Sequence, residues 1–295
     1  MAVFKMFKKI LLFSPGQIFR YRSKKYRRLY YFISRYLHLI TYLRRCYKVN
    51  YSSENYIDEN KGYLILNNLN IPDSFFSNIN SIINKINLEE KILKNDKSII
   101  TLNKNKFDSN SIVFKTITSK NIIYPIIQYL KCIPLLTYLA IWYSPNNKKI
   151  NQSSQFLHLD HEDYKQIKGF IFLEDINEDC GPLVIIDKQN SEKIQNQLDY
   201  RMTEKNKRID DNILKNYKKI TLTGKKGTVV LLDTSSCLHF GSRKASNSRL
   251  VLSFQFISPF AFVLPWFWYF SKKIKIVKNI SKESDLVLKI IGKKI

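Results

Sequence analysis

The pattern of apolar and polar residues changes about halfway along the chain. Up to residue 130 the apolar positions recur mostly three and four residues apart, which predicts helices. Beyond residue 135 they form short runs rich in β-branched and aromatic residues, which predict strands. These runs are residues 136–143, 168–173, 183–186, 227–232 and 250–257. Helices followed by a series of strands predict an α+β fold in which the strands form a sandwich or a barrel.

Residues 23–48 form a long helical pattern with an apolar stripe at alternating spacings of four and three. The stripe consists of Leu29, Ile33, Tyr36, Ile40, Leu43 and Tyr47. Two interpretations are open. The helix could lie on an anionic lipid surface with its aromatic residues at the headgroup level. Alternatively, the stripe could pack on the rest of the protein and leave the charges in water, and this second arrangement is the one we expect.

Two more helices, a strand and an insertion are predicted. Residues 62–67 predict a short buried strand, Pro72-Asp73 opens a helix, and residues 122–130 predict a second helix. The helix opened by Asp73 should bury Phe75, Phe76, Ile79, Ile82, Ile83 and Ile86. Residues 188–219 are polar and too long for a hairpin turn, so we expect a functional or mobile insertion.

The net charge of +25 is concentrated at the two ends of the chain. Residues 1–50 carry 13 Lys and Arg without an acidic residue, and residues 251–295 carry 8 Lys and 2 acidic residues. We therefore divide the chain into a basic helical segment (1–50), a central domain (51–258) and an aromatic, lysine-rich C-terminal extension (259–295). Basic ends could contact the phosphates of an anionic membrane, or the charge could only reflect a compositional bias toward Lys, Asn and Ile. Nucleic acid is not an expected partner, because the sequence has no recognition motif.

The cysteines and the apolar runs bear on the cellular location. Cys46, Cys132, Cys180 and Cys237 lie far apart without a Cys-x-x-Cys pair, a usage that suits a reducing compartment. The first 20 residues lack the apolar core of a secretory signal, and no run reaches the roughly 18 apolar residues of a membrane span. We expect a cytoplasmic protein, with peripheral membrane contact through the basic ends as the open alternative.

Three residues suggest chemistry. His158 and Asp160 are separated by one residue, so on an extended strand both side chains point to the same side and can reach one ion. His239 follows the predicted strand at 227–232 and could approach from across a barrel. Two imidazoles and one carboxylate on one face of a metal leave the opposite face open, which is the arrangement of non-haem Fe(II) oxygenases. Arg249 heads the last predicted strand, where a guanidinium could pair with the far carboxylate of a metal-bound dicarboxylic acid.

With these residues the sequence resembles the phytanoyl-CoA dioxygenase-like branch of the Fe(II)/2-oxoglutarate oxygenases, over roughly residues 60–257. The resemblance includes Gly62-Tyr-Leu-Ile-Leu66, His158-Leu-Asp160, the segment 169–186, Gly227-Thr-Val-Val-Leu-Leu-Asp233 and Asn247-x-Arg249. It implies a double-stranded β-helix, which is a jelly-roll or cupin-like barrel, with helices packed on it. It also implies that His158, Asp160 and His239 bind Fe(II), and that Arg249, assisted by Ser242, binds 2-oxoglutarate. The implied reaction uses dioxygen to hydroxylate a small or lipid-like substrate and releases succinate and CO2.

Some segments depart from the family or have a second interpretation. Residues 187–191 replace the Pro-Gly-Ser-His that often follows the Gly-x-Leu strand, and Phe170 stands where a Trp is common. We expect His161 to be a bystander and Glu162 and Asp163 to form a solvated acidic edge. The aromatic run 259–270 could anchor the chain at a membrane or pack against the N-terminal stripe. The alternative function is a catalytically inactive barrel that acts as a ligand-binding or membrane-surface module.

Overall fold

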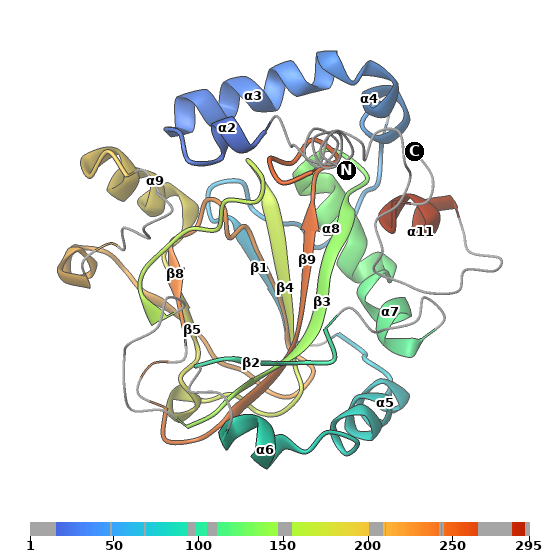
Figure 1. Ribbon diagram of the computed structural model, residues 1–295, viewed down its shortest axis with the longest axis vertical. Coiled ribbons are helices and arrows are strands. Elements are labelled where there is room, and N and C mark those ends of the chain that lie inside the picture. Colours follow the sequence, from blue (N-terminus) through green and yellow to red (C-terminus); the bar gives the residue numbers. More distant parts are fainter. Residues whose placement is uncertain are drawn as a thin grey trace, which may run out of the picture.

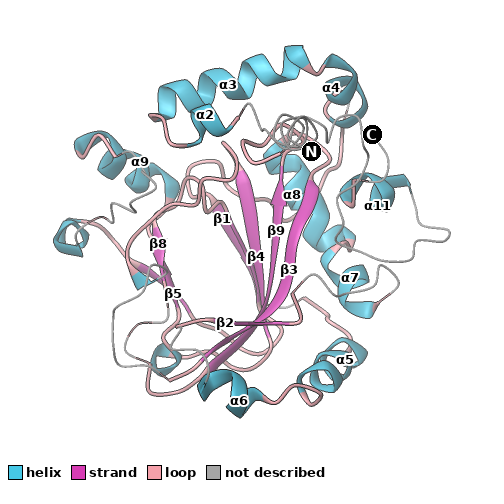
Figure 2. Ribbon diagram, in the orientation of Figure 1, coloured by secondary structure: helices cyan, strands magenta, loops and turns pink. Residues whose placement is uncertain are grey.

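The fold consists of two antiparallel sheets that face each other, with helices on the outside of the larger one (Figures 1 and 2). It was analysed in a computed structural model. The structure describes residues 16–47, 49–67, 69–93, 98–104, 111–146, 155–200, 209, 211–241, 243, 245–264 and 285–292.

The large sheet has the strand order β1-β7-β4-β9-β3-β2. Its strands are β1 (Tyr63–Leu66), β2 (Ile100–Leu102), β3 (Leu135–Ser144), β4 (Gln166–Phe172), β7 (Val229–Leu232) and β9 (Arg249–Ile257). Side chains alternate between its two faces: Val229 and Leu231 of β7 join the core under the helices, while Val230 and Leu232 face the small sheet. The strands predicted at 62–67, 136–143, 168–173, 227–232 and 250–257 are therefore confirmed.

Helices cover the outer face of this sheet. They are α5 (Asp73–Ile83), α7 (Ile112–Ile117) and α8 (Lys120–Leu130), with α6 (Leu88–Leu93) at the edge of the molecule. Phe75 and Ile79 of α5 are completely buried in the core, whereas Phe76, Ile82, Ile83 and Ile86 are only partly buried. The side chain of Ser111 caps α7 by accepting a hydrogen bond from the Phe114 N–H. Both predicted helices, at Asp73 and at 122–130, are thus present.

The small sheet has the order β6-β5-β8 and consists of β5 (Leu183–Ile185), β6 (Ile220–Leu222) and β8 (His239–Phe240). Only β5 was predicted, because β6 and β8 have three and two residues and are too short to show an alternation. Helix α9 (Lys188–Gln197) forms the start of the insertion predicted at 188–219, and Asp187 caps it by accepting a hydrogen bond from the Asn190 N–H.

The N-terminal segment forms three helices across one end of the large sheet, α2 (Gln17–Arg20), α3 (Lys24–Leu37) and α4 (Leu39–Arg45). The predicted single helix is interrupted at His38, and the expected packing of its apolar stripe on the protein is wrong. Every member of that stripe is exposed, from Ile33 at 41% to Tyr36 at 81%. The side that faces the protein instead carries Arg27, Tyr30, Ser34, Thr41 and Arg45.

Two further expectations need correction or restriction. The expected solvated acidic edge is wrong for Asp163, which is only 1% exposed. Its buried carboxylate accepts hydrogen bonds from the Ser258 and Tyr164 N–H groups. Of the C-terminal extension, only residues 259–264 and 285–292 are described, and the latter include helix α11 (Asp285–Ile290). Phe262 packs on Tyr30, with 5.4 Å between the ring centroids, so this part of the aromatic run contacts the N-terminal helices on their inner side. Its remainder, and the lysines at 272–278, lie outside the described residues.

None of the helices in the described ranges combines the length and apolar character that a bilayer crossing requires.

Candidate metal centre

His158 and His239 lie opposite each other on two neighbouring stretches of backbone. Their main chains form an antiparallel bridge in which the His158 N–H donates to the His239 carbonyl at 3.1 Å and the His239 N–H donates back at 3.0 Å. The two imidazole centroids are 4.3 Å apart. Backbone pairing between β8 and residue 158 therefore brings together two histidines that are 81 positions apart in the sequence.

Each imidazole turns its Nδ1 toward a backbone carbonyl, which leaves Nε2 as the nitrogen that can bind a metal ion. Nδ1 of His158 lies 2.7 Å from the Phe156 carbonyl, and Nδ1 of His239 lies 2.9 Å from the Cys237 carbonyl. A carbonyl oxygen only accepts, so both Nδ1 atoms carry the hydrogen and the Nε2 atoms of the neutral rings keep their lone pairs. This is the usual way in which a protein fixes the tautomer of a metal-binding histidine.

Asp160 completes the group. Its backbone N–H donates to the Thr234 carbonyl at 2.8 Å, and its Oδ2 lies 3.8 Å from Nε2 of His239. One ligand atom from each of His158, Asp160 and His239 lies within 4.8 Å of the others. Donors that share one ion at about 2 Å are separated by about 3 to 4 Å. The donor set and its spacing thus fit a divalent metal such as Fe(II) after small side-chain adjustments.

A buried lysine, Lys168, forms an ion pair with the Asp160 carboxylate. This role was not predicted from the sequence. Nζ of Lys168, on β4, lies 2.6 Å from Oδ2 of Asp160, and the two side chains are only 16% and 13% exposed. Because a carboxylate has two oxygens, one can face an ion while the other stays with the ammonium. The available signal was an isolated lysine in an otherwise apolar strand, on the same side as Phe170 and Phe172.

Charge keeps Asp160 ionised in this buried position. Burial alone would raise the pKa of its carboxyl, but Lys168, followed by His239 and His158, outweighs that effect and lowers the pKa well below the usual range. For Lys168, burial would lower the pKa of the ammonium, and the Asp160 carboxylate more than compensates and raises it. Both groups are therefore charged near neutral pH, as a carboxylate ligand requires.

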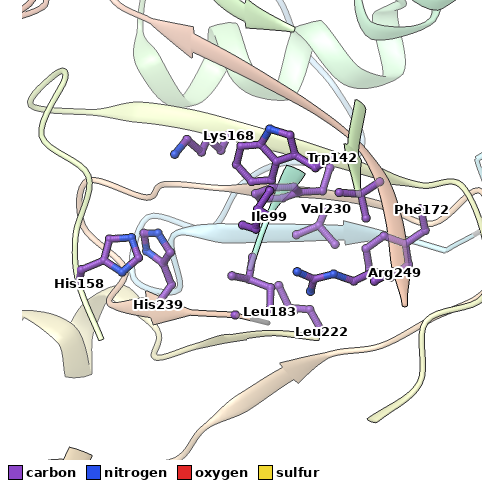
Figure 3. A pocket seen from close by; sticks show the side chains of 13 residues that line it. Ile99, Trp142, His158, Lys168, Phe172, Leu183, Leu222, Val230, His239 and Arg249 are labelled. Atoms are coloured by element: carbon purple, nitrogen blue, oxygen red, sulfur yellow. The ribbon is translucent and has the colours of Figure 1, made fainter. Parts of the chain in front are cut away.

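The metal group opens into a cavity of about 100 Å3 between the two sheets (Figure 3). Its walls are mostly apolar and include Trp142 and Val251 of the large sheet and Leu183 and Leu222 of the small one. The two histidines lie at one end, and Arg249 reaches in from the other end with its guanidinium directed toward them. The cavity thus has a metal-binding end and a cationic end, separated by apolar walls.

Arg249 is the first residue of β9 and is 6% exposed. It pairs with Ser144 in the sheet register, and its Nη2 lies 3.4 Å from the Ser144 hydroxyl. Burial lowers the pKa of the guanidinium to about 10, so it still carries its charge at neutral pH.

The remaining candidates occupy other positions. Ser242 lies outside the described residues. His161 does not line the cavity; it is buried, its Nδ1 bonds the Leu159 carbonyl at 2.9 Å, and its ring stacks near Tyr21. Trp142 was not selected from the sequence, where it was one apolar residue among others in a predicted strand, yet its indole forms part of the cavity wall.

Comparisons with known proteins identify the fold. No protein-family profile and no curated protein sequence matches the chain. Among solved structures, the apo form of EctD from S. alaskensis is similar with a TM-score of 0.51 and 12% identity, over 74% of this chain and 85% of that one. EctD with 2-oxoglutarate and 5-hydroxyectoine aligns with a TM-score of 0.49 and 14% identity, over 78% and 90% of the two chains. The non-haem alpha-ketoglutarate-dependent epimerase SnoN from nogalamycin biosynthesis aligns with a TM-score of 0.45 and 12% identity, over 68% and 78%.

The match to apo EctD and the geometry of the His-Asp-His group lead to one conclusion: the chain has the fold of the phytanoyl-CoA dioxygenase-like Fe(II)/2-oxoglutarate oxygenases and carries a candidate iron site of the His-x-Asp…His type.

Proposed function

We propose that this protein is an Fe(II)/2-oxoglutarate-dependent dioxygenase that hydroxylates a small or lipid-like molecule. In the reaction, dioxygen and 2-oxoglutarate convert a substrate C–H group to C–OH, and succinate and CO2 are released. The observation that carries the proposal is the convergence of two imidazole Nε2 atoms and the Asp160 carboxylate at one end of a cavity that also contains Arg249. EctD, whose apo structure shares the fold, has also been solved with Fe and with 2-oxoglutarate.

In this proposal His158, Asp160 and His239 hold the ion, and Lys168 orients the carboxylate. Bound Fe(II) would supply the redox chemistry that couples the decarboxylation of 2-oxoglutarate to the oxidation of the substrate. The residues of the chain keep three ligands on one side of the site, so the opposite side remains available to the reactants. The Nδ1–carbonyl bonds of both histidines prevent the rings from turning away.

Arg249 selects a dicarboxylic cosubstrate. A buried guanidinium in a mostly apolar cavity gains strongly from a carboxylate partner, because the low local dielectric strengthens the ion pair and two parallel hydrogen bonds fix its orientation. Its position opposite the histidines suits a molecule that binds the metal through one end and carries a carboxylate at the other. Ser242 stays a proposed second contact to that carboxylate.

The apolar walls favour a hydrophobic portion of the substrate at the iron. Trp142, Phe170 and Phe172 contribute aromatic rings to the wall of the cavity. Its volume of about 100 Å3 is well below the roughly 300 to 1,000 Å3 of pockets that enclose whole ligands. In this proposal the cavity accommodates the cosubstrate, and the substrate presents only its reacting group to the metal.

The experiment is an anaerobic titration of the metal-free protein with Fe(II) and 2-oxoglutarate, monitored through the weak visible charge-transfer band of the chelate. The wild type should develop the band, His239→Ala should lack it, and Arg249→Ala should need a 2-oxoglutarate concentration about tenfold or more higher. His161→Ala, which removes a buried imidazole outside the metal group, is the matched control and should keep the band.

A folded wild-type protein that binds neither ligand would contradict the proposal. In that case the inactive barrel, acting as a binding module, would become the better description. Loss of the band in His161→Ala as well, with the fold intact by circular dichroism, would argue against the assignment of the ligands.

A further inference from the structure

An apolar surface covers the outer side of the N-terminal helices. Of the 13 large apolar side chains that are exposed in the described part of the chain, 11 lie between residues 18 and 47. They are Ile18, Tyr26, Leu29, Phe32, Ile33, Tyr36, Leu37, Leu39, Ile40, Leu43 and Tyr47, and we call them the outer face. The other two, Tyr56 and Leu198, are isolated. Soluble monomers seldom expose such a contiguous apolar set unless it binds something.

Arginine contacts on the opposite side fix this orientation. Arg27 donates to the Asp163 carbonyl at 2.9 Å, and Arg45 donates to the Lys289 carbonyl at 2.7 Å. Arg20 donates to the His161 carbonyl at 3.0 Å. Turning the helices to bury the outer face would break these buried hydrogen bonds, each of which involves a charged donor and is therefore among the stronger ones. The exposure of the apolar residues is thus built into the packing.

Along residues 16–47, the charged side chains that border the outer face are all basic. The chain contains no acidic residue before Glu54. The exposed basic residues of this segment are Arg22, between α2 and α3, Lys24, Lys25 and Arg28 of α3, and Arg44 of α4. Lys24 contacts Glu192 of α9, and the other four have no carboxylate partner among the ion pairs of the described residues. The face therefore combines large apolar and aromatic side chains with a cationic border.

This combination identifies the partner. A second copy of the chain would bring one basic face against another, which like-charge repulsion opposes. Nucleic acid would satisfy the cations but leave the apolar residues against phosphates. An anionic lipid surface satisfies both, because the apolar side chains enter the acyl boundary while the lysines and arginines remain at the headgroup phosphates.

We propose that the outer face of α2–α4 docks the protein on an anionic membrane surface. The proposal is independent of the iron chemistry, since vesicle binding requires no metal. It has one consequence for the site: α2 and α3 are attached to residues 161–163, which directly follow the ligand Asp160. The inner side of the helices that carry the docked surface therefore contacts the segment next to the metal centre, which suits a substrate drawn from the membrane.

The test is flotation of the full-length protein with phosphatidylcholine vesicles, with and without phosphatidylserine. Tyr36→Gln with Ile40→Gln removes two of the three most exposed apolar residues of the face, at 81% and 66% exposure. The matched control is Tyr56→Gln with Leu198→Gln, which removes the isolated residues of similar size at 58% and 48% exposure. The first pair should lower the partition coefficient on anionic vesicles by about tenfold or more, and the control pair should leave it unchanged.

A second pair of variants tests the charges. Lys25→Gln with Arg28→Gln should weaken binding to anionic vesicles by about tenfold, whereas Lys225→Gln, at an exposed position far along the chain, should have no effect. The proposal is overturned by wild-type protein that does not float, by equal losses in the control pairs, or by binding that depends on the charges alone. A wild-type dimer in sedimentation that becomes monomeric in the Tyr36/Ile40 variant would assign the face to a second copy instead.

Discussion

In strand β9, Leu252, Phe254 and Phe256 point into the helical layer and have no exposed surface, whereas Ile33 and Ile40 of α3 and α4 are 41% and 66% exposed. Charged residues show the reverse distribution. The described barrel strands keep few of them inside, and those are concentrated at the cavity, while α3 and α4 bury Arg27 and Arg45 against the protein. The same residue types are therefore used in opposite directions in two parts of one chain.

This difference shows that the periodicity of apolar residues defines the faces of a helix or strand but does not decide which face is buried. In the sheet, backbone hydrogen bonds to two neighbours leave each side chain only two directions, and the core occupies one of them. A surface helix can rotate about its axis, and its orientation is decided by the strongest specific contacts available. Here those contacts are guanidinium groups on backbone carbonyls.

The largest expected effect concerns the barrel core. Phe254→Ala should lower the free energy of unfolding by about 3 to 5 kcal/mol, because it leaves a cavity beside Gly169 and the helical layer. Ile33→Ala, on the outer face, should change it by about 0.5 kcal/mol or less. Urea unfolding of both variants measures the contrast, and similar losses in the two would mean that Ile33 is not exposed in solution.

The buried ion pair of the metal centre should come next. Lys168→Met leaves the Asp160 carboxylate without its ammonium and should destabilise the metal-free protein by about 2 to 3 kcal/mol. Lys165→Met, three residues earlier and outside the cavity, is the control and should cost about 1 kcal/mol or less.

Adding Fe(II) provides a second test of the Lys168–Asp160 ion pair. The ion can replace the ammonium as the partner of the carboxylate, so added Fe(II) should raise the thermal midpoint of Lys168→Met at least as much as that of the wild type. A smaller shift in the variant would mean that Asp160 needs Lys168 in order to bind the metal.

The contacts that fix the orientation of α3 can be tested by substituting Arg27. Arg27→Ala removes a buried charged hydrogen bond to the Asp163 carbonyl and the contact with the Phe262 ring, and should cost about 2 kcal/mol. Arg28→Ala, the neighbouring exposed position, should cost about 0.5 kcal/mol or less. Chemical denaturation gives both values. Equal, small effects would show that the arginines do not set the orientation of the helix.

A pH dependence of stability is also expected at the same interface. Burial raises the pKa of Asp163 to about 7, although hydrogen bonds from Ser258 and Tyr164 oppose the rise. Between pH 4 and 7 the folded state then retains a proton that the unfolded state has released, so the stability conferred by this group decreases as the pH rises. The wild type should lose roughly 1 kcal/mol per pH unit across that window relative to Asp163→Asn.

An exposed carboxylate provides the control for this measurement. Asp175 pairs with Lys225, and its pKa is lowered, so it does not titrate in the same window. Asp175→Asn should therefore leave the pH slope of the wild type unchanged. A wild-type slope equal to that of Asp163→Asn would mean that Asp163 is ionised throughout.

The residues of the candidate metal centre show the same difference between what the sequence pattern predicts and what it leaves open. His158 and Asp160 could be selected because a spacing of one residue on extended backbone is a local property. His239 and Arg249 could be selected as residue types near the ends of predicted strands, and the structure brings both to one cavity. Lys168 and Trp142 escaped because their significance depends on which residues stand opposite them in the folded sheets.

By itself, the sequence determined the α+β class, the positions of the long strands and the helices at α5 and α8, and the group of candidate ligands. These follow from spacing, residue type and turn residues, which act over a few positions. The tertiary structure alone decided the short strands β6 and β8, the pairing of Lys168 with Asp160, the burial of Asp163, and the outward direction of the apolar face on α3 and α4. Each of these features depends on which residues, far apart in the chain, contact one another in the folded protein. Their relative free energies are set only once all of those residues are packed together.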